Sequence, residues 1–190
     1  MAPISLPDIT AISEVNRNYI TYFNRKIGHV PNLYRFMMHS DHAFNTYYAF
    51  HSRETSLSLR ELEAVSLVVA QVNRSLYCLS AHTMIARLNG FSDEEIRQMR
   101  KGTAGFDPRL DALVKLVKSF AGNKGKNIAY QLNNFFSAGY TREHFIDVLQ
   151  AMGENFISNL TAKTLNVPID FPLAPELPTD ENISQLPGED

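Results

Sequence analysis

Residues 57–96, "LSLRELEAVSLVVAQVNRSLYCLSAHTMIARLNGFSDEEI", decide the fold of this chain. Their apolar side chains recur at helical spacing, and the stretch contains no convincing alternation of the kind that a β-strand produces. The pattern predicts one helix over 58–72 and a second over 76–89. The break between them is short, so we expect an antiparallel helix hairpin that turns near Arg74.

The rest of the chain extends this helical pattern. Ser58 with Glu61 and Ser92 with Glu95 have the spacing of capping boxes, which mark helix starts. We therefore predict an all-α bundle of about eight helices. Their expected ranges are 9–26, 31–52, 58–72, 76–89, 92–101, 107–122, 127–138 and 141–165.

The length and composition are those of one globular domain. The chain has 190 residues, 44% hydrophobic and 20% charged, which is enough to bury one substantial core. The last 25 residues contain five of the nine prolines and six acidic residues. We predict a single helical domain over 1–167 and a proline-rich acidic tail over 168–190.

Charge and hydropathy exclude several classes of function. The formal net charge is -2, so no basic face is forced on the molecule and we expect no nucleic-acid partner. The start "MAPISLPDIT" lacks the basic and apolar regions of a signal peptide, and no apolar run is long enough for a membrane span. A single cysteine excludes an intrachain disulfide and fits a reducing cytoplasm, where we expect the protein to reside.

The stretch "VNRSLYCLSAH", residues 72–82, has the features of a reactive-thiol site. If Ser75 caps the helix, Cys78 falls in its first turn, where the helix dipole favours an anion. We therefore expect the pKa of the Cys78 thiol to be lowered. His82 lies one turn further on the same helix face, within reach of the sulfur directly or through one water.

Glu63 is the third candidate of this site. It lies in an apolar helix, where a buried carboxylate needs a partner. In the expected hairpin Glu63 and His82 are nearly level, so a Glu–His–Cys proton relay is sterically reasonable. The alternative is structural: a lone cysteine in an apolar helix is often an inert core residue, and Glu63 could simply pair with an arginine.

Residues 57–96 resemble the core of the carboxymuconolactone decarboxylase superfamily, most closely its alkylhydroperoxidase D (AhpD)-like, peroxidase-related branch. That branch has a glutamate followed twelve residues later by Cys-x-x-Cys-x-x-x-His, and Glu63, Cys78 and His82 fall on those positions. "IGHVPNLYRFM" upstream and "NVPIDFP" downstream resemble further segments of the branch.

One position departs from this pattern: Ser75 replaces the first cysteine. The resemblance implies that Cys78 attacks a peroxide while Glu63 and His82 move protons. It also implies that the missing cysteine would have resolved the oxidised thiol. The cycle would then need an external thiol or dithiol. A serine keeps the expected helix cap, which is a structural reason for its presence.

The resemblance implies a thiol-dependent peroxidase that acts on alkyl hydroperoxides or hydrogen peroxide. It implies no metal, haem or flavin, and a homo-oligomer, trimeric or hexameric. Two alternatives stay open. One is a cofactor-free acid/base lyase that uses His82 and Glu63, and the other is a non-catalytic member of the family.

Overall fold

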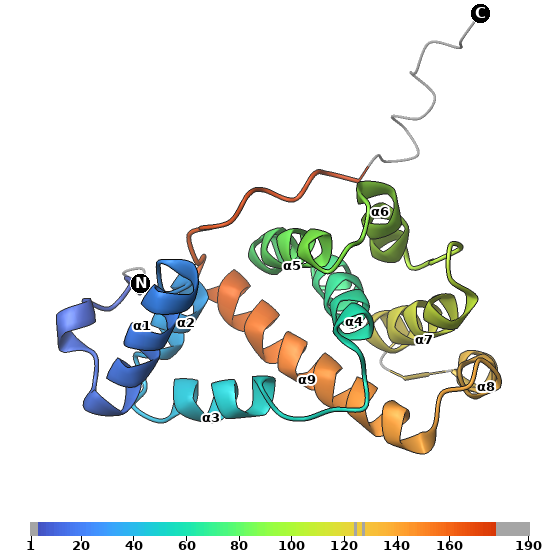
Figure 1. The fold of residues 1–190 in the computed structure, drawn as a ribbon, viewed down its shortest axis with the longest axis horizontal. Coiled ribbons are helices and arrows are strands. Elements are labelled where there is room, and N and C mark those ends of the chain that lie inside the picture. Colours follow the sequence, from blue (N-terminus) through green and yellow to red (C-terminus); the bar gives the residue numbers. More distant parts are fainter. Residues whose placement is uncertain (1–3, 124, 127, 178–190) are drawn as a thin grey trace, which may run out of the picture.

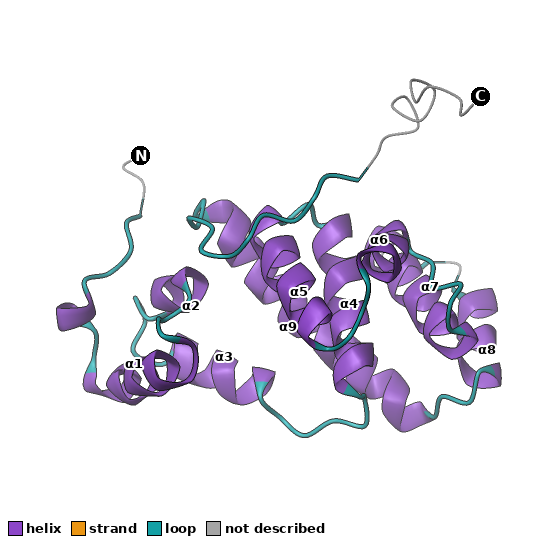
Figure 2. Ribbon diagram, turned by 45° about the horizontal axis from the view of Figure 1, so that its top comes forward, coloured by secondary structure: helices purple, strands orange, loops and turns teal. Residues whose placement is uncertain are grey.

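The fold is entirely helical over the residues that the structure describes. A computed structural model describes residues 4–123, 125–126 and 128–177, and no strand occurs among them (Figure 2). A short 3₁₀ turn, η1 (Ile9–Ala11), precedes nine α-helices within this part of the chain (Figure 1). These are α1 (Glu14–Ile27), α2 (Asn32–Met37), α3 (Ala43–His51), α4 (Leu59–Val72), α5 (Leu76–Leu88), α6 (Asp93–Lys101), α7 (Pro108–Asn123), α8 (Ala129–Ser137) and α9 (Arg142–Thr164).

The expected all-α class is confirmed, but two predicted helices are interrupted. The range 9–26 divides into η1 and α1, because Ser13 has an extended backbone between them. The range 31–52 divides into α2 and α3. Between these two helices the hydroxyl of Ser40 accepts a hydrogen bond from the amide of Ala43 at 3.2 Å, and the carbonyl oxygen of Ser40 accepts one from the side-chain amide of Asn16 of α1 at 3.3 Å. These two hydrogen bonds of Ser40 take the place of regular helical hydrogen bonds. The spacing of apolar residues in the sequence does not predict them.

The helix starts expected around the hairpin are present. Ser58 and Glu61 form a complete capping box on α4, and Ser92 and Glu95 form another on α6. The α4–α5 turn closes at Arg74, which adopts a left-handed φ of 53°. Glycine is the residue that most often adopts this conformation. The turn at Arg74 reverses the chain, so that α4 and α5 run antiparallel.

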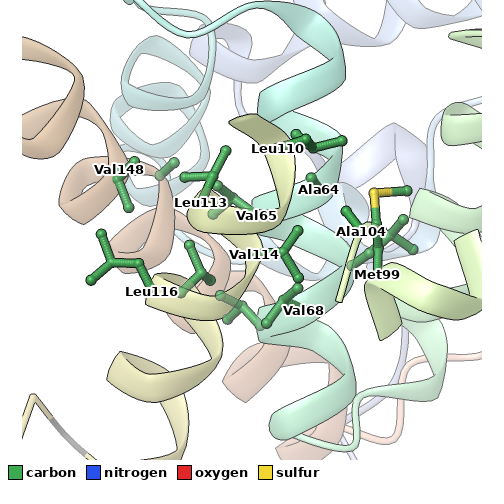
Figure 3. Close-up of a cluster of buried hydrophobic side chains, with 14 of the residues drawn as sticks. Ala64, Val65, Val68, Met99, Ala104, Leu110, Leu113, Val114, Leu116 and Val148 are labelled. Atoms are coloured by element: carbon green, nitrogen blue, oxygen red, sulfur yellow. The ribbon is translucent and has the colours of Figure 1, made fainter. Parts of the chain in front are cut away.

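The main core surrounds α4, which is apolar on most sides. It packs against α5, α6, α7 and α9, and α9 runs diagonally through the molecule (Figure 1). Figure 3 shows side chains of α4 and α7 interleaved in this core, with Met99 of α6 and Val148 of α9 beside them. Burying a large aliphatic side chain of this kind contributes roughly 1.5–3 kcal/mol. Glu63 is carried by α4, so the packing of this central helix holds Glu63 in place.

Two smaller clusters complete the structure. One joins α1, α2 and α3, and the other joins α2, α5 and the end of α9 to the extended segment 168–177. This segment runs from the end of α9 past α5 to α6 (Figure 1). The boundary between domain and tail stays a prediction, and residues 178–190 lie outside the described part. None of the helices described is long and apolar enough to cross a membrane.

Candidate active site

Glu63 and His82 meet across the α4–α5 hairpin. Glu63 Oε2 lies 2.9 Å from His82 Nδ1, and both side chains are largely shielded from solvent. Burial of the ring disfavours its protonation, but the charge and hydrogen bond of Glu63 outweigh it, with a smaller contribution from Glu154. The pKa of His82 is therefore raised above its usual value. The expectation that the two residues lie nearly level is confirmed, and the structure adds that their side chains face each other.

Cys78 lies one turn before His82 in the first turn of α5 and is only 3% exposed. Burial disfavours the thiolate and raises the pKa of Cys78 from 9.0 to about 11. The expected lowering of this pKa is wrong, because loss of hydration outweighs the position at the helix start. A pKa this high leaves the thiol protonated at neutral pH, so ionisation at Cys78 requires help from its neighbours.

Ser75 precedes α5 and is completely buried. Its side chain makes no capping bond, so the expected helix cap by its hydroxyl is wrong. The hydroxyl instead lies near the Cys78 thiol and acts to lower its pKa. Within the described part of the chain, Ser75 Oγ has no hydrogen-bond partner of regular geometry. The match of Ser75 to the first cysteine of the family motif stays an interpretation of the sequence.

The surface is hollowed at the start of α5, next to Ser75. A surface pocket of about 400 Å³ is lined in part by Ser75, Tyr77 and Lys163. Solvent therefore approaches the start of the helix, although the thiol itself is covered.

Helix α9 supplies polar groups that sequence reasoning missed. Ser158 and Asn159 lie near the Cys78 sulfur, and hydrogen bonding from both acts against the rise in its pKa. Together with Glu154 and Asn155 they form a buried polar face, since all four residues are at most 9% exposed. The signal was present in "GENFISNL", where polar residues recur four apart inside an apolar helix.

Glu154 forms a second carboxylate–histidine pair beside the first. Its Oε1 atom accepts a hydrogen bond from the hydroxyl of Tyr47 and lies 3.3 Å from Nδ1 of His51, both on α3. Burial disfavours its ionisation, but the bond and charge of His51 and the bond from Tyr47 keep the pKa of Glu154 below its usual range. Its charge also acts on His82 and Cys78. The two pairs therefore share one electrostatic environment.

The two outer segments that carry the family resemblance pack against each other at the start of α5. Asp170 Oδ2 accepts a hydrogen bond from the amide of Asn32 at 2.8 Å, and the hydroxyl of Tyr77 accepts one from the amide of Leu33 at 3.1 Å. The ring of Tyr77 packs edge-on against Phe171. These contacts fix the residue that precedes Cys78. Among the described residues no group of three or more His, Cys, Asp or Glu side chains has metal-binding geometry.

The central part of the sequence and the fold both support a relation to the carboxymuconolactone decarboxylase superfamily. Residues 39–118 match the model of the carboxymuconolactone decarboxylase family, and this segment contains Glu63, Ser75, Cys78 and His82. The matched segment is 80 of the 190 residues, and the fold is that of the AhpD-like proteins. Comparison with curated protein sequences finds no match.

Solved structures support the fold along most of the chain. An uncharacterized peroxidase-related protein with an AhpD core from Ralstonia eutropha JMP134 is 22% identical, with a TM-score of 0.79 over 95% of this chain and 93% of that one. A peroxidase-related protein from Silicibacter sp. TM1040 is 20% identical, with a TM-score of 0.77 over 88% and 92%. The debrominase Bmp8, in a complex with 2,3,4-tribromopyrrole, is 13% identical, with a TM-score of 0.68 over 88% and 90%. The debrominase demonstrates that this fold serves more than one activity.

Proposed function

We propose that the protein is a thiol-dependent peroxidase that reduces alkyl hydroperoxides or hydrogen peroxide through Cys78. The observation that carries the proposal is the Glu63–His82 hydrogen bond, with Cys78 one turn before His82 on the same helix. A paired histidine can take a proton from a thiol and return it to a leaving oxygen. The raised pKa of His82 makes the neutral ring a better acceptor of the thiol proton and stabilises the imidazolium that then donates to the leaving oxygen.

The first half of the reaction needs no proton from solvent. The Cys78 sulfur attacks one peroxide oxygen, and the S–O bond forms as the O–O bond breaks. The sulfur is oxidised by two electrons and the peroxide is reduced. The thiol proton passes through His82 to the leaving oxygen, which departs as an alcohol or water. Cys78 is then a sulfenic acid.

The second half needs an external thiol or dithiol. Ser75 has an oxygen beside the sulfur and cannot form a disulfide with it. A reductant sulfur would attack the sulfenic acid, release water and leave a mixed disulfide. A second reductant thiol would then free Cys78. The pocket at the start of α5 is the side from which such a reductant could approach. This chemistry requires a reducing compartment, and we propose the cytoplasm.

The test is to treat the protein with a stoichiometric amount of peroxide and to measure its intact mass by mass spectrometry. We expect one added oxygen on Cys78, trapped by a sulfenic-acid reagent, and consumption of peroxide faster than by free cysteine. The matched control is Cys78→Ser, which keeps the Glu63–His82 pair. A wild-type chain that reacts no faster than free cysteine with any hydroperoxide would exclude the peroxidase.

One observation favours a second candidate, a cofactor-free acid/base lyase. Burial raises the pKa of Cys78 to about 11, while the Glu63–His82 pair is complete without the thiol. In that case His82 would move a proton on a lactone or keto acid, and Cys78→Ser would retain activity toward it. Loss of all activity with both substrate classes would leave a non-catalytic member of the family.

A further inference from the structure

The pocket at the start of α5 is bordered by positive charge. Arg74, in the α4–α5 turn, and Lys163, in the last turn of α9, both line this pocket of about 400 Å³. Both residues are exposed, and neither takes part in an ion pair within the described part of the chain. Among the described residues that line the pocket, none is acidic. An anion that enters the pocket is therefore attracted, and no carboxylate in the wall opposes it.

Neighbouring contacts hold this charge in place. Lys163 Nζ donates a hydrogen bond to the carbonyl oxygen of Asn73 at 2.7 Å, which leaves two N–H groups for a ligand. Asp170 follows the lining residue Ile169 in the sequence, but its Oδ2 atom accepts a hydrogen bond from the amide of Asn32 of α2 at 2.8 Å. This carboxylate is therefore engaged with α2 and does not pair with the cations.

Hydrogen-bond donors lie in the same wall. Ser75 lines the pocket and is completely buried, and within the described part of the chain its hydroxyl has no hydrogen-bond partner of regular geometry. No side chain caps α5, so the amides of its first turn and the positive end of its dipole remain available. A carboxylate complements such a wall, because its oxygens accept hydrogen bonds while the cations balance its charge.

The pocket is also close to the reactive thiol. Ser75 and Cys78 are three residues apart at the start of α5, and side chains at this spacing are neighbours on a helix. A ligand held against Ser75 therefore has the Cys78 sulfur one helical turn away. The volume of the pocket is sufficient for a small organic molecule.

We propose that Arg74, Lys163 and Ser75 form a subsite that binds the carboxylate of the thiol reductant. This inference rests on the proposed function, since a reductant is required only after Cys78 is oxidised. With its carboxylate held there, the reductant sulfur attacks the sulfenic sulfur of Cys78. The S–S bond forms, the S–O bond breaks, and the oxygen takes the reductant thiol proton and leaves as water. The reductant is then a small anionic thiol, not a neutral one.

Alkylation of the unoxidised thiol tests the subsite without peroxide. Cys78 is the single cysteine, so intact mass after alkylation follows this side chain alone. Iodoacetate carries a carboxylate, and iodoacetamide is a neutral reagent of nearly the same size. The ratio of their two rates measures the attraction of a carboxylate, because ionisation of the thiol affects both rates equally. We expect this ratio to exceed that for 2-mercaptoethanol by roughly threefold to tenfold and to fall as salt is added.

Substitution of the two cations should remove this preference. Arg74→Gln and Lys163→Gln should each lower the ratio by about twofold or more, and Lys163→Arg should retain it. Both positions are exposed, so either variant decides the matter if the other does not fold. Arg142→Gln is the control, because it removes the same charge at the other end of α9, roughly 30 Å from Lys163, and should keep the ratio.

Three results would overturn the subsite. One is a ratio no greater than that for 2-mercaptoethanol. Another is a ratio that Arg74→Gln and Lys163→Gln both leave unchanged. The third is a failure of both reagents to modify Cys78, which would mean that the pocket does not lead to the thiol.

Turnover separates the subsite from the peroxidase. In a chain that consumes peroxide, the KM for 3-mercaptopropionate should be several-fold below that for 3-mercaptopropionamide, and Arg74→Gln should reduce this difference. Equal KM values and no preference in alkylation reject the subsite and leave the proposed function standing. A preference in alkylation by a chain that consumes no peroxide supports a carboxylate subsite and rejects the proposed function. A charge preference that appears only between a hydroperoxide acid and its methyl ester overturns the assignment to the reductant.

Discussion

The Nδ1 atom of His82 lies 2.9 Å from Oε2 of Glu63, and this contact joins the two helices of the hairpin one turn beyond Cys78. Both side chains are mostly buried, with exposed fractions of 18% and 12%. Removing one partner of a buried charged pair leaves the other uncompensated, so the pair has consequences for stability as well as for chemistry.

The pair should make stability depend on pH in a defined direction. The pKa of His82 is higher in the folded state than its usual 6.5, so the folded chain holds this proton more tightly than the unfolded chain does. The stabilisation is fully present below about pH 6.5 and is lost as pH rises through the folded pKa. Every tenfold gain in the affinity of the folded chain for this proton corresponds to about 1.4 kcal/mol of stability.

Glu63→Gln should flatten this pH dependence, because the charge that raises the pKa of His82 is gone. Urea unfolding at intervals from pH 6 upward measures it, and NMR titration of the His82 ring should find a lower pKa in the variant. Glu143→Gln, an exposed change on α9, is the control and should leave the profile unaltered. If the free energy of unfolding of Glu63→Gln depends on pH as that of the wild-type chain does, the pair does not contribute to the pH dependence of stability.

Glu63 and His82 should also act as one unit in the reaction. Loss of an acid/base group costs about 10²–10⁴-fold in rate, so Glu63→Gln and His82→Gln should each slow peroxide consumption within that range. The double variant should be little slower than the worse single variant. Initial rates with one hydroperoxide give the comparison. Losses that multiply fully would argue for two independent functions.

The hairpin was predictable from sequence, and the surroundings of the thiol were not. The capping pairs and the apolar spacing predicted that Glu63 and His82 lie at the same level of the hairpin. Both features are local in the sequence, so they can be identified without knowledge of the tertiary structure. The environment of Cys78 depends on Ser158 and Asn159 of α9, about eighty residues further along the chain. Burial of the thiol raises its pKa and so reverses the direction expected from the helix start alone, while the donors Ser158 and Asn159 of α9 act against that rise.

Cys78 should titrate with a midpoint near 11, because burial disfavours the thiolate. The rate of alkylation against pH measures this midpoint, and the single cysteine removes ambiguity. Ser158→Ala should raise the midpoint further, since it removes a donor. Ser5→Ala, a hydroxyl loss at an exposed residue, should not change it. A midpoint at or below the free-thiol value of about 8.5 would restore the activated thiol expected from sequence.

The protein should form a homo-oligomer through α9, which has an apolar stripe on its outer side. Five large side chains of this stripe are between 38% and 57% exposed: Ile146, Leu149, Phe156, Ile157 and Leu160. Their spacing places them on one face of the helix, a pattern typical of an interface. Phe156→Lys should dissociate the assembly in light scattering. Leu88→Lys, at an even more exposed apolar site on α5, should not. A monomeric wild-type chain at micromolar concentration would contradict the prediction.

The most discriminating prediction concerns Ser75. The wild-type chain should stop at the sulfenic acid unless a small thiol is supplied, and it should over-oxidise as peroxide increases. Ser75→Cys places a second thiol beside the Cys78 sulfur, where the serine hydroxyl now lies. The variant should therefore form an internal disulfide after one equivalent of peroxide and should gain turnover with a dithiol reductant.

Peroxide-dependent oxidation of a dithiol, with intact mass to count bridges, measures both effects of Ser75→Cys. Ser80→Cys is the matched control, because residues two apart on a helix do not face each other and its thiol should not pair with Cys78. A bridge in Ser75→Cys without turnover in either chain would show that the geometry is right and the peroxidase is wrong. If no bridge forms, the two side chains are not neighbours at the start of α5, and the placement of the thiol site has to be abandoned.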